Sequence, residues 1–120
     1  MRLLALRGAT TCDEDSLDEI DRKTQGLVRE MLVRNDIENE DIVSIIFTAT
    51  DDLHAQFPAT AARALGLGDV PLICARELDI EGAMPRAIRV LMHLYTDRSR
   101  ADLHHVYLGA AKSLRDELPE

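Results

Sequence analysis

The chain has 120 residues, a formal net charge of −8 at pH 7 and an aromatic content of 3%. This length predicts a single domain, residues 1–120, around one aliphatic core. The acidic balance argues against binding to nucleic acid or to an anionic membrane, both of which need a basic surface. Cys12 and Cys74 are too few for a disulfide scaffold, and the apolar start at residues 3–6 is too short for a signal or membrane segment. We therefore expect a cytoplasmic protein.

The first predicted elements are a strand over residues 2–9 and a long helix. Ser16 and Glu19 match a capping box, in which side chains satisfy the free amide groups at the start of a helix. Apolar residues then recur at helical spacing, which predicts an amphipathic helix that ends near Asn35. Its buried stripe is predicted to contain Leu17, Ile20, Leu27, Val28, Met31 and Leu32.

The rest of the chain predicts four more strands and two short helices. Residues 42–48 are β-branched and aliphatic, which favours a buried strand. Pro58 suits the first turn of a helix that would end at Gly66 or Gly68. Strands are then expected over residues 70–75, 87–95 and 104–108, followed by a short helix. Pro85 favours a strand over a helix for residues 87–95.

This order of elements predicts an α/β (α+β) fold with a mixed five-stranded sheet, one long amphipathic helix and short helices. So few helices would leave one face of the sheet uncovered. We therefore expect a homo-oligomer, in which closure around a symmetry axis buries that face.

Arginine provides twelve of the fourteen basic side chains. Arg7 and Arg89 interrupt apolar strand segments, and Arg115 lies near the C-terminus. A guanidinium with apolar neighbours is costly unless it is paired, and its planar fork matches a carboxylate. This pattern predicts a small ligand that carries two carboxylates.

Several segments stand in an order that is typical of one family. They are Arg-Gly-Ala-Thr-Thr at 7–11, residues 48–59 with Phe-Pro-Ala at their end, and His-Val-Tyr-Leu at 105–108, supported by Ile-Arg-Val at 88–90 and Thr-Asp at 96–97. With these segments the chain resembles the monofunctional chorismate mutases of the trimeric α/β type. The resemblance implies a homotrimer that closes a pseudo-α/β barrel, with sites at the subunit interfaces. It also implies the rearrangement of chorismate to prephenate in aromatic amino acid biosynthesis, without a cofactor, a metal or a covalent intermediate.

The resemblance also implies a role for each site residue. Arg89 would stabilise negative charge on the ether oxygen, Glu77 and Cys74 would contact the ring hydroxyl, and Arg7 and Tyr107 would hold the side-chain carboxylate. The remaining residues would form apolar walls or capture the substrate: Phe57, Ala59, Thr60, Arg63, Leu72, Ile73, Leu114 and Arg115.

Two features of the sequence depart from the family pattern or complicate it. Thr60 stands where the family commonly has a lysine, which removes one cation near the entrance and predicts weaker substrate capture. Arg76 adds a charge between Cys74 and Glu77. It could compensate for the missing lysine, or it could pair with Glu77 and weaken the role of that carboxylate.

Simpler explanations exist for the same residues. Arginines at strand ends are more often surface ion-pair partners, Glu77 would by default be a solvated loop carboxylate, and Cys74, Phe57 and Tyr107 would ordinarily be core residues. The histidines lack zinc-ligand spacing, and His104 and His105, as neighbours on a strand, would point to opposite faces. The competing function is a non-catalytic trimer that binds carboxylate metabolites and regulates another process.

Overall fold

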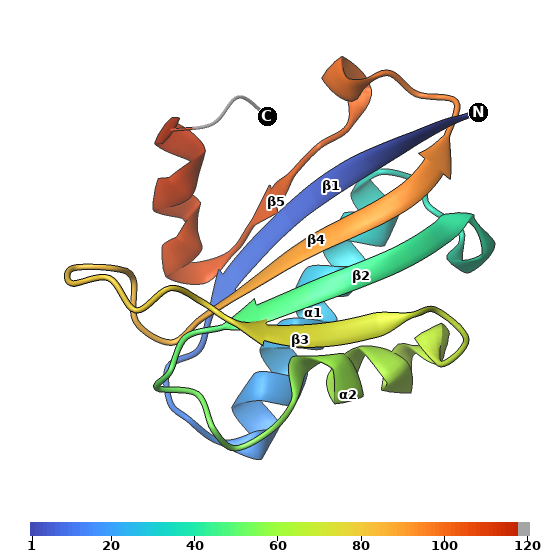
Figure 1. The fold of residues 1–120 in the computed structure, drawn as a ribbon. Coiled ribbons are helices and arrows are strands. Elements are labelled where there is room, and N and C mark those ends of the chain that lie inside the picture. The colour runs from blue at the N-terminus through green and yellow to red at the C-terminus, as the bar shows by residue number, and fades with distance from the viewer. Residues whose placement is uncertain (118–120) are drawn as a thin grey trace.

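The computed structural model describes residues 1–117 of the chain, and the side chains of residues 1–114. The elements follow the predicted order of strand, helix, strand, helix, three strands and a short helix (Figure 1). Their bounds are β1 Arg2–Thr11, α1 Leu17–Arg34, η1 Asn39–Asp41, β2 Ile42–Ala49, α2 Pro58–Ala62, η2 Arg63–Leu67, β3 Leu72–Arg76, β4 Ala87–Thr96, η3 Arg100–Asp102, β5 Val106–Tyr107 and η4 Gly109–Glu117.

The five strands form one mixed sheet in the order β3-β2-β4-β1-β5, which confirms the predicted sheet. Strand β4 runs antiparallel to both of its neighbours, β1 and β2. Each edge strand runs parallel to its neighbour, β3 to β2 and β5 to β1. The central position of β4 places its residues between side chains from the first and second strands of the chain.

Helix α1 starts at the predicted cap. The Ser16 hydroxyl accepts a hydrogen bond from the Glu19 backbone N–H at 3.1 Å, which satisfies one of the free amide groups of the first turn. The Glu19 carboxylate accepts from the backbone N–H of Asp13 at 3.0 Å and also pairs with Arg22. The hydrogen bond from Asp13 lowers the pKa of Glu19, and Arg22 adds to the effect. The prediction that Leu17 lies on the buried stripe is wrong, since this first helical residue is 55% exposed.

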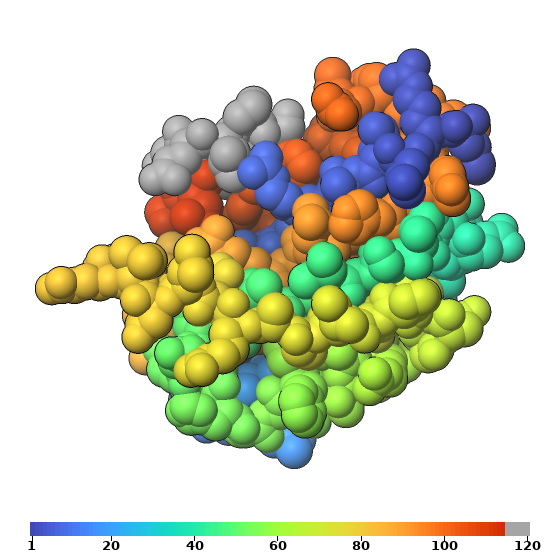
Figure 2. All heavy atoms as spheres, viewed as in Figure 1, coloured from blue at the N-terminus to red at the C-terminus, as the bar shows by residue number. Residues whose placement is uncertain are grey.

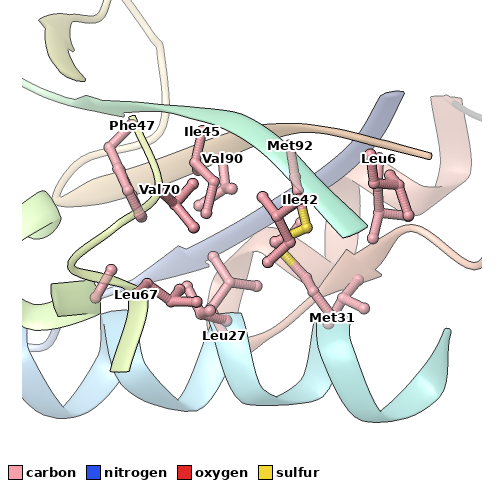
Figure 3. Close-up of a cluster of buried hydrophobic side chains, with 14 of the residues drawn as sticks. Leu6, Leu27, Met31, Ile42, Ile45, Phe47, Leu67, Val70, Val90 and Met92 are labelled. Atoms are coloured by element: carbon pink, nitrogen blue, oxygen red, sulfur yellow. The ribbon is translucent and has the colours of Figure 1, made fainter. Parts of the chain in front are cut away.

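The main core lies between α1 and one face of the sheet (Figure 3). Phe47 and Met92 of the sheet pack with Leu27 and Met31 of the helix, and all four side chains are fully buried. The helix approaches β1 closely at Gly8, where an added Cβ would meet the Met31 sulfur at 2.5 Å. This tight contact sets the distance between α1 and β1, the strand that carries Arg7.

The opposite face of the sheet, called here the uncovered face, carries no helix over most of its area in the part of the chain that the structure describes (Figures 1 and 2). Helix η4 packs on it only at the β5 edge, against Ala9 and Tyr107. Large apolar side chains lie exposed on it, among them Leu3 and its cross-strand partner Tyr95, and Ile73 at 61% exposure. Such a surface is unusual for a monomer and typical of an interface. Within residues 1–117, no helix is long and apolar enough to cross a membrane.

Two local predictions need correction. Strand β3 starts at Leu72 rather than at residue 70, because Pro71 has no N–H to contribute to a sheet. Strand β5 contains only Val106 and Tyr107, so His104 and His105 precede it and the expectation that they alternate on a strand is wrong. The second helix ends at Gly68, as predicted, after it widens into a π-type turn at η2 and bends at Gly66, which has a φ of 89°.

Candidate active site

Two rows of side chains cross the uncovered face of the sheet side by side. The first row joins Tyr107, Ala9, Arg89 and Thr48, which are direct partners across β5, β1, β4 and β2. The second row lies two residues away on three of the strands and joins Arg7, Leu91 and Ile46. Because side chains alternate along a strand, both rows project from the same face. Strand pairing therefore gathers residues that are far apart in the sequence.

These two rows and Glu77 line a cavity of about 330 Å³, called here the main site cavity. Four of the five predicted catalytic residues, Arg7, Glu77, Arg89 and Tyr107, lie in it. Glu77 follows β3, and its Oε1 lies 2.7 Å from Nε of Arg89. The Arg89 side chain is 48% exposed and the Glu77 side chain 22% exposed, so both remain within reach of a ligand.

The charge added by Arg76 does not disturb this pair. Arg76 pairs with Asp51, with a distance of 2.9 Å between Nη2 and Oδ1, so the alternative in which Arg76 pairs with Glu77 is wrong. The default interpretation of Glu77 as a solvated loop carboxylate is also wrong. Its pairing with Arg89 fixes a negative group beside a positive one on the floor of the cavity.

The loop from Glu77 to β4 is held at its end by Asp52. Both Asp52 carboxylate oxygens accept hydrogen bonds from the Arg86 backbone N–H, at 3.0 and 3.1 Å, and one also accepts from the Thr50 hydroxyl. Burial alone would raise the pKa of Asp52, but these hydrogen bonds outweigh it and lower the pKa. Arg86 adopts a positive φ of 48° at this point. The Asp52 contacts therefore fix the chain at Arg86, directly before β4 and three residues before Arg89.

Two hydroxyls in the main site cavity have no hydrogen-bond partner among the side chains that the structure describes. The Tyr107 OH and the Thr48 Oγ1 are both buried and unpaired, and both residues line the cavity. An unpaired buried hydroxyl carries a free-energy cost that a bound ligand can remove. The sequence indicated Tyr107 but not Thr48. Thr48 lies in the site because it pairs with Arg89 across β2 and β4, and strand pairing is not visible in a sequence.

The predicted apolar and capturing residues line a different hollow. This second cavity, of about 430 Å³, is lined by Phe57, Ala59, Thr60, Arg63, Leu72, Ile73 and Cys74. Phe57 is 69% exposed and Cys74 is also exposed, so the interpretation of these two residues as core residues is wrong. Within one chain, then, Cys74 and the predicted walls lie apart from Arg7, Arg89 and Tyr107.

The predicted residues at the C-terminus lie beside Tyr107. Leu114 is partly buried and packs against a small cluster of Ala9, Tyr107 and Ala111. Its helix, η4, is anchored where the Ala110 backbone N–H donates to the Thr11 hydroxyl at 3.0 Å. The side chain of Arg115 lies outside the described residues, so its predicted role stays a prediction.

The remaining reactive groups have structural surroundings. Cys12 is buried, and burial raises the pKa of its thiol to about 11, so it is protonated at neutral pH and unreactive. Among the described residues, no three histidine, cysteine or acidic side chains gather as a metal site would require. The main site cavity contains two guanidinium groups, one carboxylate and two unpaired hydroxyls, which suits a small anionic molecule with hydroxyl or ether oxygens.

Comparison with known proteins gives this site a family. The chain matches the chorismate mutase type I family over residues 3–118, and it belongs to that family. It is 44% identical over 114 residues to chorismate mutase AroH of Thermus thermophilus, covering 94% of this chain and 93% of that protein. It is 40% identical over 119 residues to chorismate mutase AroH of Bacillus subtilis, covering 98% and 94%.

A solved structure agrees with these matches. The chorismate mutase from Clostridium thermocellum superposes with a TM-score of 0.90 and 48% sequence identity, covering 92% of this chain and 98% of that one. The resemblance inferred from the sequence segments is therefore confirmed.

Proposed function

We propose that this chain is a chorismate mutase, an isomerase that converts chorismate to prephenate in aromatic amino acid biosynthesis. Family membership and the names of the relatives support the reaction. The observation that carries it in the structure is the main site cavity, where Arg89, Glu77, Arg7 and Tyr107 meet on one face of the sheet. We take residues 1–120 as one chorismate-mutase-like domain.

Arg89 stabilises the transition state by meeting charge as it forms. In the rearrangement, the C–O bond breaks ahead of C–C bond formation, so negative charge builds up on the ether oxygen. Nε of the Arg89 guanidinium contacts the Glu77 carboxylate, so the two Nη groups are left to donate to the ether oxygen. A donor that is fixed before the reaction loses no energy to reorganisation when the charge develops.

Glu77 acts on the ring of the substrate. Its carboxylate accepts a hydrogen bond from the ring hydroxyl and faces the ring as positive charge develops there. The pairing with Arg89 keeps Glu77 in place without covering it, since more than a fifth of its side chain stays exposed. Cys74, an exposed thiol, is the second contact for the hydroxyl.

Arg7 and Tyr107 hold the side-chain carboxylate of the substrate. Arg7 forms no ion pair with any acidic side chain among residues 1–114, and the Tyr107 hydroxyl is buried without a partner. A carboxylate placed between them would satisfy both groups. Holding it there keeps the substrate in the compact geometry that the rearrangement requires. Binding therefore orients the substrate in advance and lowers the activation barrier.

Completion of the site requires a second subunit. We infer a homotrimer that closes a pseudo-α/β barrel, in which the second cavity of one subunit, carrying Phe57, Arg63 and Cys74, faces the main site cavity of its neighbour. The exposed Leu3, Ile73 and Tyr95 on the uncovered sheet face support this association, because an interface would bury them. Thr60 adds no charge to the entrance, so Arg63 carries the larger part of substrate capture from that side.

A direct assay tests the function. Purified protein should remove chorismate, followed by its ultraviolet absorbance, without added metal and with no loss on addition of a chelator. Light scattering should give the mass of three chains. Absence of turnover together with tight chorismate binding in calorimetry would instead support the non-catalytic metabolite-binding trimer. The exposed Cys74 thiol in the site suits a reducing cytoplasm, where we expect the protein to work.

A further inference from the structure

His105 makes an unusual contact with the strand that carries Arg7. Its ring Nδ1 accepts a hydrogen bond from the Arg7 backbone N–H at 3.0 Å. The parallel pairing of β1 with β5 begins one residue later, with Gly8 opposite Val106 and Ala9 opposite Tyr107. The imidazole therefore replaces a backbone acceptor and adds one hydrogen bond to a very short strand pairing.

This hydrogen bond assigns the proton on the ring. A backbone N–H only donates, so Nδ1 must carry a lone pair, and the proton of the neutral imidazole sits on Nε2. An imidazolium carries protons on both nitrogens, so a protonated His105 would oppose one N–H to another and lose the contact.

The surroundings of His105 favour the neutral ring. His105 lines a cavity of about 210 Å³ with Arg7 of β1 and Arg100 of η3, together with Ala5 and Leu103. No acidic side chain lines this cavity in the described part of the chain, so both charged side chains that line it with His105 are cations. Burial lowers the pKa of His105 below its ordinary value of 6.5, and the charge on Arg7 lowers it further.

We propose that His105 is a positioning residue for substrate binding, which holds Arg7 and Tyr107 at their proper spacing through the hydrogen bond to the Arg7 backbone. The contact lies where β5 begins, and β5 brings Tyr107 next to Ala9, two residues after Arg7. Arg7 and Tyr107 share the main site cavity. The inference rests on the proposed function, because it assigns these two residues to the substrate carboxylate.

Three variants of His105 test it in the intact protein. His105→Asn places an amide oxygen near the position of Nδ1, His105→Gln places one near Nε2, and His105→Leu has no acceptor. The Gln and Leu variants should raise KM for chorismate by about threefold to tenfold, the effect of one hydrogen bond, with kcat little changed. The Asn variant should keep a KM within about twofold of the parent. Equal KM values for the Asn and Leu variants would overturn the proposal.

The pH profile supplies a readout that a purely structural role would not change. In the parent protein, kcat/KM should fall in acid, at pH values lower than the ordinary histidine pKa of 6.5, because His105 has a lowered pKa and takes up a proton only there, which releases the Arg7 backbone. The Asn variant should lack this fall, since an amide does not titrate in this range. An unchanged acid limb in the Asn variant would contradict the assignment.

Nuclear magnetic resonance separates this proposal from the proposed function. With ¹⁵N-labelled histidine, the His105 signals, identified by their loss in the Asn variant, should show a bare Nδ1 and a protonated Nε2 at neutral pH. A proton on Nδ1 would refute the contact regardless of catalysis. A confirmed tautomer without turnover of chorismate would instead count against the proposed function alone.

Discussion

Replacement of Arg89 by Lys tests the proposed electrostatic mechanism at its centre. In the structure, Nε of Arg89 lies 2.7 Å from Oε1 of Glu77, and in our proposal the two Nη groups contact the substrate. A lysine has one nitrogen at the end of a flexible chain, so it must serve either Glu77 or the ether oxygen. We therefore expect Arg89→Lys to keep the net charge of the site and still lose most of the catalysis.

The expected magnitudes for activity and stability differ widely. Loss of one donor that is fixed for a developing oxyanion costs ~2.7 to 4 kcal/mol, which corresponds to a fall in kcat of about 10² to 10³. The ion pair with Glu77 is half exposed on the arginine side, so its loss should change the free energy of unfolding by less than about 1 kcal/mol. A large kinetic effect with a small change in stability is the signature of a residue that acts on the transition state.

The assay is steady-state loss of chorismate absorbance, with urea unfolding as the measure of stability. Arg34→Lys is a matched control, because Arg34 also places its Nε 2.7 Å from a carboxylate, that of Glu30, but on the surface of α1. The control should keep full activity. A kcat for Arg89→Lys within a few-fold of the parent would refute the role given to the guanidinium.

Three further outcomes are expected. Thr48→Val should raise KM for chorismate by about threefold to tenfold without loss of thermal stability, because it removes an unpaired buried hydroxyl, and an unchanged KM would exclude a ligand contact. Gly8→Ala should lower the free energy of unfolding by about 1 to 3 kcal/mol, since its Cβ meets the Met31 sulfur at 2.5 Å, whereas Gly26→Ala, with nothing within 4 Å, should not destabilise the helix. The free energy of unfolding should fall as the pH drops below about 4.5, because the pKa of Glu19 is lowered in the folded protein and the unfolded chain binds more protons there. Urea unfolding at pH 7 and pH 3 measures this fall, and Glu19→Gln should reduce it.

The elements could be predicted from the sequence because their signals are local. Ser16 caps α1 through a contact that spans three residues, and the apolar spacing of the helix follows from its own geometry. The failures are local too. Leu17 fits the apolar period but is the first helical residue and lies exposed. Residues 104–108 predicted a longer last strand, but only Val106 and Tyr107 pair with β1.

The site could be predicted only in part, because it depends on pairing between distant strands. Arg7 and Arg89 could be predicted because they are charges within apolar strands. Nothing in the sequence places Thr48 next to Arg89 or His105 against the Arg7 backbone. The division of the predicted residues between two cavities was likewise invisible. Phe57 and Cys74 are exposed at a distance from the main site cavity because their partners, in our proposal, belong to another subunit.

A mixing experiment with two defective variants tests the shared site most directly. Arg89→Ala damages the main site cavity and Arg63→Glu damages the second cavity, and each trimer should be nearly inactive alone. Subunits that are coexpressed with different tags and purified as mixed trimers should regain about one third of the intact sites, because a ring that contains both variants has one junction in three at which an undamaged main site cavity meets an undamaged second cavity. Activity of the mixed trimers no higher than that of the two parents would show that each chain builds its site alone.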